Sequence, residues 1–289
     1  MRPELIEATR LLRSGEAADL DRALRLIQKT VFSFGMKVCG HPQDAEDTTQ
    51  DVLLKSLPYL RRIESPKALA VWLYKVTRNR CWMSRRRSKF APDVTLSLEE
   101  LMPDGDELQA LTAKHAVDPE AHASREQETE RVRRAVLRIP AKYRLILVLH
   151  DMEGLDTSEV AKITALTEGT VRVRLHRARL YVRRELASTK AAAPKPRRKA
   201  KPPSCKQIFA GLSEYLDGRL DDLTCDRVQR HLQDCPPCVA FLEDLRKAIE
   251  RCRSAEAQCE PAAAGKLRKL LLDEYIRMSE APGHPASRA

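Results

Sequence analysis

The sequence predicts an all-α protein with two small helical domains and a C-terminal helical module that carries a cysteine and histidine cluster. Apolar residues recur at helical spacing through most of the chain, and segments rich in proline divide the helical stretches. The cluster, near residue 231, has the close spacing of metal ligands. In chain order, the predicted parts are a helical domain at residues 1–90, an acidic linker at 91–128 and a second helical domain at 129–188. A basic proline-rich linker at 189–203 and the final module at 204–280 follow.

Composition limits the partners and the environment of the protein. The 289 residues carry a net charge of +11, which favours a polyanion partner but does not distinguish DNA, RNA and an anionic membrane. The sequence has no run of about 20 apolar residues, which a membrane-spanning helix would need. The start MRPELIEATRLLRSG also lacks the apolar region of a secretory signal. We therefore expect a cytoplasmic protein without membrane contact, in which the eight cysteines serve metal or redox chemistry rather than a disulfide framework.

The first domain is predicted to contain a long core helix followed by an acidic helix. The apolar stripe of the first helix comprises Leu20, Leu24, Ile27, Val31, Phe34 and Val38. Turn residues 40–43 precede the second helix, whose inward positions are Ala45, Val52, Leu53 and Leu57. Its exposed acids favour contact with a protein, since phosphate would repel them; alternatively, they complement the helix dipole. The spacing leaves both interpretations open.

Residues 65–89, SPKALAVWLYKVTRNRCWMSRRRSK, combine aromatic and basic side chains. Trp72, Tyr74 and Trp82 offer flat faces, and the cations between and after them suit a nucleic-acid backbone, so the segment favours single-strand binding. An alternative places Trp72 in the core, because its spacing with the neighbouring apolar residues is helical. The residues predicted to contact nucleic acid are Lys75, Arg78, Asn79 and Trp72.

The stretch from Phe90 to Glu128 is acidic and interrupted by proline and glycine, which predicts a solvated tether. Helices resume at residues 129–139, stop at Pro140 and continue through AKYRLILVLHDMEG. The apolar residues of that segment are expected to pack behind the helices that follow; they are Leu145, Ile146, Val148 and Leu149.

Residues 156–184 predict a helix-turn-helix. Asp156 and Glu159 form a capping box, Thr167 caps a second helix, and that helix turns an apolar stripe inward at Val171, Leu175, Ala178 and Val182. The same periodicity directs basic side chains outward at Arg172, Arg174, His176, Arg177, Arg179, Arg183 and Arg184. Such a helix can read guanine edges near its start and meet phosphates further along. The predicted DNA contacts are Thr170, Arg172, Arg174, His176 and Arg177; the alternative is a surface helix with solvated arginines.

The C-terminal module contains the pattern H-x3-C-x2-C, formed by His231, Cys235 and Cys238. A histidine one helical turn before a tight pair of thiolates is typical of a structural zinc site, which needs a fourth ligand from either Cys205 or Cys225. Such a closed set of ligands argues against a zinc hydrolase.

The remaining cysteines have no clear metal pattern. Cys39 and Cys81 are interpreted as buried free thiols in helical stripes, whereas Cys252 and Cys259 are either spare or resolving thiols. A further amphipathic helix is predicted in GKLRKLLLDEYIRM, with an apolar face at Leu267, Leu270, Leu271, Tyr275 and Met278.

Several of these motifs resemble extracytoplasmic-function sigma factors, the small bacterial initiation factors of RNA polymerase. EGTVRVRLHRAR, after DMEGLDTSEVAKI, resembles their upstream promoter-recognition region; residues 65–89 resemble the helix that melts and reads the −10 element. HPQDAEDTTQDVLLKSL resembles the helix that docks on the polymerase clamp, which implies contacts by Asp47, Gln50, Asp51 and Lys55. Val173 departs from the family, which usually has a small polar residue there, so the preferred bases are expected to differ.

Residues 204–250 resemble the zinc-binding anti-sigma domain, in which a ligand precedes the H-x3-C-x2-C motif at the position that Cys205 occupies. The combined resemblance implies a non-enzymatic initiation factor that binds core RNA polymerase, promoter DNA and zinc. We expect the zinc module to pack in cis on the sigma-like domains, and loss of metal or oxidation to release it. The alternative is a stand-alone metal- or redox-responsive DNA-binding regulator that does not bind polymerase.

Overall fold

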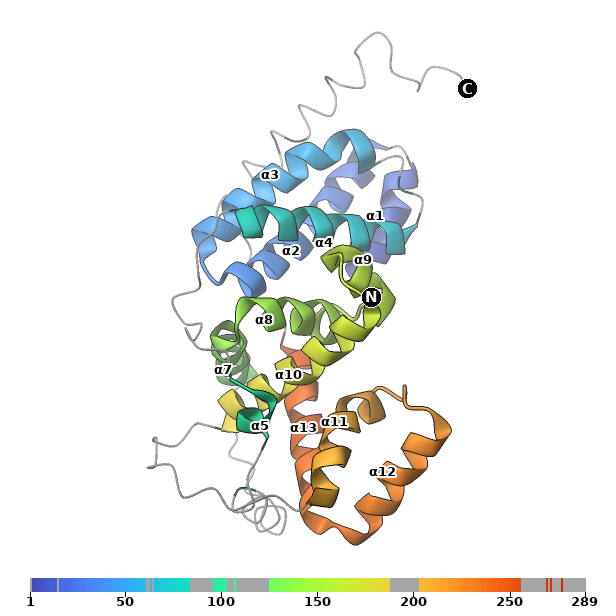
Figure 1. Cartoon of the computed structure of the whole chain (residues 1–289). Helices are drawn as coiled ribbons and strands as arrows, with labels where there is room; N and C mark the ends of the chain where they lie inside the picture. The colour runs from blue at the N-terminus through green and yellow to red at the C-terminus, as the bar shows by residue number, and fades with distance from the viewer. Residues whose placement is uncertain are drawn as a thin grey trace. The chain divides into compact units, whose positions relative to one another are not determined.

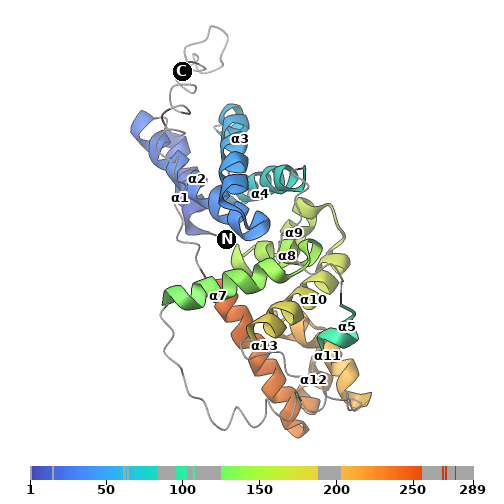
Figure 2. The same ribbon diagram turned by 90° about the vertical axis from the view of Figure 1, so that its left-hand side faces the viewer.

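The computed structural model (Figures 1 and 2) describes residues 2–14, 16–60, 63, 65–83, 96–102, 107, 125–187, 203–255, 269, 271 and 277. Every regular element in these ranges is a helix, which confirms the predicted all-α class. The chain forms two compact units. Unit 1 takes its residues from Met1–Ser88, Glu153–Ala165 and Ala257–Ala289, and unit 2 from Lys89–Met152 and Leu166–Glu256. The segment Glu153–Ala165, predicted with the second domain, thus packs with the first.

Unit 1 is built from helices that bury the predicted apolar stripes. Its helices are α1 (Pro3–Ser14), α2 (Ala17–Cys39), α3 (Pro42–Leu60), α4 (Pro66–Met83) and α9 (Thr157–Thr164). The predicted inward residues of α3 are all buried, as are those of α2 from Leu20 to Phe34. Gly40 ends α2 with a φ of 79°, a left-handed conformation that glycine adopts without steric cost. The sequence therefore predicted this core from local periodicity.

A buried carboxylate, Glu153, holds α9 and the preceding turn on the other helices of unit 1. Lys37 Nζ lies 2.8 Å from Glu153 Oε1, Tyr74 donates its hydroxyl proton to Oε2 over 2.6 Å, and Arg2 forms a further ion pair. Burial alone would raise the pKa of Glu153, but Lys37 and Arg2 outweigh it and lower that pKa. Tyr74 is 2% exposed, so its predicted role as a stacking platform is wrong: its ring also packs on Phe34, 4.8 Å between centroids.

Unit 2 combines the helices around α10 with the cysteine module. Its elements are α5 (Leu98–Leu101), α7 (Arg125–Arg138), α8 (Ala141–Leu147), the π-helix η1 (Val148–Met152), α10 (Glu168–Ala187), α11 (Pro203–Leu216), α12 (Asp222–Asp234) and α13 (Pro236–Ser254). The four apolar residues predicted to pack behind the helix-turn-helix are buried in α8 and η1. Tyr143 of α8 stacks on Tyr181 of α10, 5.6 Å between centroids.

Part of the predicted acidic tether is structured. Ser97 and Glu100 form a capping box that starts α5, and Leu96 N–H donates to the Tyr181 hydroxyl over 2.6 Å. Arg184 donates to the Glu100 carbonyl oxygen, 3.1 Å away, so this short helix lies on the last turns of α10. α7 also begins earlier than predicted, at Arg125.

None of the described helices has both the length and the apolar character needed to cross a bilayer. The predicted amphipathic helix after residue 264 lies outside the described residues, apart from Lys269, Leu271 and Arg277. Of its predicted apolar face, Leu271 is described, and it is buried.

Candidate metal cluster and DNA-contacting helices

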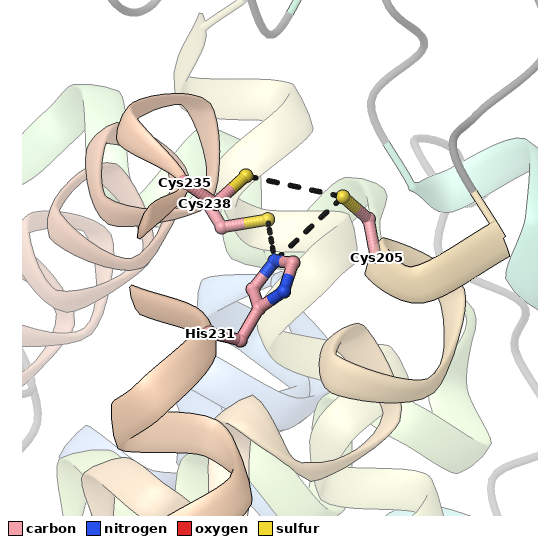
Figure 3. A group of neighbouring side chains, drawn as sticks. All are labelled: Cys205, His231, Cys235 and Cys238. Carbon is pink, nitrogen blue, oxygen red and sulfur yellow. Dashed lines mark hydrogen bonds between the residues drawn. The ribbon is translucent and has the colours of Figure 1, made fainter. Parts of the chain in front are cut away.

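Four side chains of unit 2 converge on one point: Cys205, His231, Cys235 and Cys238 (Figure 3). Cys205 lies in the first turn of α11, His231 in the last turn of α12, and Cys238 in the first turn of α13. Cys235 connects α12 to α13. Cys225 does not belong to this cluster, so between the two candidate fourth ligands the fold brings Cys205 to the site.

The spacing of the donor atoms fits one tetrahedral zinc ion. All four lie within 4.8 Å of one another; Cys205 Sγ is 4.0 Å from Cys235 Sγ and 3.7 Å from His231 Nε2. Around a tetrahedral ion with usual zinc bond lengths, two sulfurs would be ~3.8 Å apart, and a sulfur and a nitrogen ~3.5 Å. Three thiols and one imidazole leave no open coordination position, as in a structural site. Burial, and after it the neighbouring sulfurs, raise the pKa of Cys238, which favours the protonated thiol. A bound cation would lower this pKa again and stabilise the thiolate.

Local sequence explains how the ligands are presented. Asp221 caps α12 by accepting the Thr224 N–H over 3.0 Å, which sets the direction of the helix that ends at His231. Prolines at the first positions of α13 favour a helix start directly after Cys235. The Cys238 N–H donates to the Cys235 carbonyl over 3.0 Å, so a tight turn brings the two thiols together. Phe209 and Phe241 meet edge to face, 5.0 Å between centroids, and join α11 to α13.

The basic helix α10 is partly covered. Thr167 Oγ1 accepts the Thr170 N–H over 3.3 Å, and Val171, Leu175, Ala178 and Val182 are buried, as predicted. The prediction that all its basic side chains face outward is wrong: His176, Arg179 and Arg183 are buried. The physical reason is that α11 and α13 pack on α10 (Figure 2). The charges of Arg179 and Arg183 are compensated by Asp151 of η1, Asp217 in the turn after α11 and Asp244 of α13.

Arg179 is the centre of this contact. Its guanidinium is fully buried and forms two hydrogen bonds to Asp151, of 2.8 and 2.7 Å, and two to Asp217, of 2.9 and 2.8 Å. It also donates to the Ser213 carbonyl over 3.1 Å. Burial would raise the pKa of Asp151 and lower that of Arg179, but the ion pair reverses both effects. Each carboxylate faces the guanidinium bidentately, which is the strongest geometry for this pair.

Two further basic residues of α10 contact the cysteine module. His176 Nδ1 lies 2.8 Å from the Ser213 hydroxyl, and its Nε2 is buried without a hydrogen-bond partner among the described residues. Burial, with the charges of Arg179 and Arg177, lowers the pKa of His176 to about 4, so it is neutral near pH 7. Arg183 Nε donates a hydrogen bond to Asp244 Oδ2 over 2.6 Å, and its guanidinium lies 4.5 Å from the centroid of the Phe241 ring.

The first half of α10 is more accessible. Thr170, Arg172, Arg174 and Arg177 are half-buried, and Val173 is 59% exposed. Arg172 Nε lies 3.4 Å from Glu214 of α11, and Arg177 donates to the Tyr143 hydroxyl over 3.1 Å. The predicted base-reading end of the helix therefore lies at the edge of the cysteine module.

The predicted nucleic-acid residues of α4 have different environments. Lys75 and Asn79 are exposed, and Trp72 is half-buried beside Tyr59, 6.0 Å between centroids. Arg78 instead donates to the Ile163 carbonyl at the end of α9 over 2.6 Å. Lys67, near the start of α4, adds ion pairs of 3.2 and 3.1 Å to Asp156 and Glu159, which form the predicted capping box of α9.

The acidic face of α3 is accessible. Asp47, Gln50 and Lys55 are exposed, and Asp51 is half-buried in an ion pair of 2.6 Å with Arg80 of α4. The acids that pair with α10 were not predicted from the sequence; they are Asp151, Asp217 and Asp244. One signal existed: Arg179 lies four residues after Leu175 and three before Val182, on the apolar stripe, where an arginine needs a buried partner.

Comparison with known proteins identifies the two helical regions and the module. Residues 24–90 match "Sigma-70 region 2", residues 129–181 match "Sigma-70, region 4", and residues 205–238 match a family described as "Putative zinc-finger". The chain belongs to the extracytoplasmic-function (ECF) sigma factors. Members of this family are transcription initiation factors without enzymatic activity.

Curated relatives support this assignment. ECF RNA polymerase sigma factor SigW of Bacillus subtilis is 24% identical over 54% of this chain and 82% of the relative. ECF RNA polymerase sigma factor SigM of Mycobacterium tuberculosis is 26% identical over 60% of this chain and 80% of the relative. In this sigma factor, the region 2 match covers most of α2 and all of α3 and α4. The region 4 match covers α8, η1, α9 and α10 as far as Tyr181, and the four donor residues lie in the zinc-finger match.

Proposed function

We propose that this sigma factor directs RNA polymerase to specific promoters and that its zinc module restrains the region 4 helix α10 in cis. The observation that carries the proposal is the buried ion pair of Arg179, a residue of the DNA-reading region, with Asp217 of the zinc module. The two sigma-70 regions support promoter recognition, and the contact supports regulation.

Charge supports a contact that competes with DNA. Asp217 and Asp244 of the module pair with Arg179 and Arg183, and Glu214 lies beside Arg172. Carboxylates here stand where phosphates would otherwise meet the same guanidinium groups. Promoter DNA can engage the whole helix only after the module leaves it.

The region 2 helix α4 is restrained in a similar way by α9. Arg78, a proposed contact to the −10 strand, is engaged by the Ile163 carbonyl, and Lys67 by two acids of α9. Lys75 and Asn79 remain exposed. In the proposed mechanism, α9 leaves α4 before Arg78 contacts the strand exposed by melting, and Trp72 supplies an aromatic face next to the cations.

The accessible face of α3 is the proposed docking surface for core polymerase. Asp47, Gln50, Asp51 and Lys55 share this face, and its acidic residues would be repelled by DNA. The zinc ion would be held by Cys205, His231, Cys235 and Cys238 and would fix the ends of α11, α12 and α13, so that Asp217 and Asp244 face α10.

A pull-down with core RNA polymerase tests the proposal. The full chain is expected to bind, and Asp47→Lys to weaken binding by at least tenfold, since charge reversal at an interface costs more than about 1.4 kcal/mol. Glu16→Lys is the matched control, because Glu16 is exposed in unit 1 and makes no side-chain cap bond. Absence of any binding would favour a stand-alone DNA-binding regulator.

A further inference from the structure

Two cysteines of unit 1 meet outside the metal cluster. Cys39 is the last residue of α2, and Cys81 lies in the last turn of α4. Their Sγ atoms are 2.7 Å apart, and both residues are half-buried rather than fully buried as the sequence predicted. Helical periodicity did not reveal this contact, because the two residues are 42 positions apart.

The separation of the sulfurs favours a bond between them over a shared metal ion. Two thiolates on one zinc ion lie ~3.8 Å apart, which exceeds the distance here. A disulfide has an S–S bond of ~2.05 Å, so the two sulfurs need to approach by only about 0.7 Å. Partial exposure also allows a small oxidant to reach the pair.

The environment of Cys81 favours its thiolate. The hydrogen bond with Cys39 lowers the pKa of Cys81; burial opposes this effect, and the Thr48 hydroxyl, 4.0 Å from Sγ, assists it. A thiolate, not a thiol, attacks peroxides and disulfides. The lowered pKa suits Cys81 to the attacking role, and the Cys39 sulfur, 2.7 Å away, is placed to resolve the product.

We propose that Cys39 and Cys81 are a redox site of this sigma factor, separate from the zinc cluster, and form a reversible intramolecular disulfide on reaction with a hydroperoxide. The Cys81 thiolate attacks the peroxide O–O bond, forms a sulfenic acid and releases hydroxide. Cys39 loses its proton to that hydroxide and attacks the sulfenic sulfur, which forms the S–S bond and releases the second oxygen as hydroxide. This second hydroxide takes up the proton that Cys81 released when its thiolate formed. The net reaction converts two thiols and hydrogen peroxide into one disulfide and two waters.

The bond would tie the end of α4 to the end of α2. Arg78 and Asn79 lie within one helical turn before Cys81, so the restraint acts on residues proposed to contact the melted strand. It requires no change at the zinc cluster, whose four donors belong to unit 2. The sigma-like part would thus respond to peroxide independently of its zinc module.

The test uses the full-length, reduced, zinc-loaded protein and one equivalent of hydrogen peroxide, followed by alkylation, trypsin digestion and mass spectrometry. Cleavage after Lys37, Lys55, Arg80 and Arg85 yields peptides 38–55 and 81–85. The expected product is these two peptides joined by a disulfide and separated by dithiothreitol. A chromogenic chelator monitors zinc release in the same sample.

Matched variants make the result specific. Cys39→Ser and Cys81→Ser are each expected to abolish the linked peptide, whereas Cys225→Ser, a half-buried thiol outside both clusters, retains it. The proposal is overturned if the wild type consumes peroxide without forming the 38–55/81–85 link, or if Cys81 pairs with a different cysteine. The readout involves neither polymerase nor DNA, so failure of the proposed function would leave it unaffected.

Discussion

Replacing Asp217 with alanine should release α10 from the zinc module. Asp217 accepts two charge-assisted hydrogen bonds from Arg179, and its side chain is 12% exposed, so solvent screens the pair weakly. A hydrogen bond to a charged group contributes ~1.5–3 kcal/mol. Because Arg179 keeps both bonds to Asp151, its charge is not left unpaired, and we expect a total loss of ~2–3 kcal/mol rather than the larger cost of an orphaned buried ion.

That loss shifts the balance between the closed and open states by about 100-fold. When only an open fraction binds, the apparent Kd equals the intrinsic Kd divided by that fraction, so promoter affinity should rise by up to ~100-fold in Asp217→Ala. Fluorescence anisotropy at fixed salt measures this change. The labelled duplex is a promoter fragment that core polymerase transcribes in the presence of this protein.

Asp226→Ala is the matched control for charge. Asp226 is an exposed residue of α12 in the same module, so its removal changes the net charge equally without touching α10. Equal tightening of DNA binding in both variants would contradict a restraint through Asp217. An unchanged DNA affinity in Asp217→Ala, at unchanged zinc content, would contradict it as well.

Three further results are expected. Cys205→Ser should lose most of its zinc by atomic emission spectroscopy, whereas Cys225→Ser keeps it; equal zinc contents would contradict the ligand set. Glu153→Gln should lower the free energy of unfolding, measured in urea, by about 3 kcal/mol. The stability of the wild type should fall as the pH drops below about 4.5 and toward the lowered pKa of Glu153 in the folded state. A free energy of unfolding that is unchanged in Glu153→Gln would contradict the buried network. The pKa of His176 is about 4 in the closed state and ~6.5 when the side chain is exposed, so its contribution to the closed state is fully present above pH 6.5. At pH 5.5 the equilibrium constant for closure should fall about tenfold, because the exposed imidazole takes up a proton. Anisotropy titrations showing an equal pH dependence in Asp217→Ala would argue against this.

Features set by neighbouring residues were predictable from the sequence. The Asp156–Glu159 capping box and the α10 stripe follow from spacing within a few residues, and the structure contains both. His231, Cys235 and Cys238 are close in the chain, so their convergence was also predictable. Cys205 is 26 residues before His231, and the resemblance, not the spacing, selected it over Cys225.

Features that depend on distant partners were not predictable in the same way. Arg179 is buried only because Asp151 and Asp217, 28 and 38 residues away, reach it from other helices. Its spacing from Leu175 and Val182 places it on the apolar stripe, but no local pattern shows which acids meet it there. Cys39 and Cys81 each fit a helical stripe, but no local pattern indicates that their sulfurs meet.

Reconstituted transcription tests the central claim most directly. Core RNA polymerase with the full chain, on a genomic fragment library, is predicted to initiate at a restricted set of start sites, and Asp217→Ala is predicted to increase transcripts from the same sites. Random or absent initiation with both proteins would contradict the assignment of promoter recognition to α4 and α10.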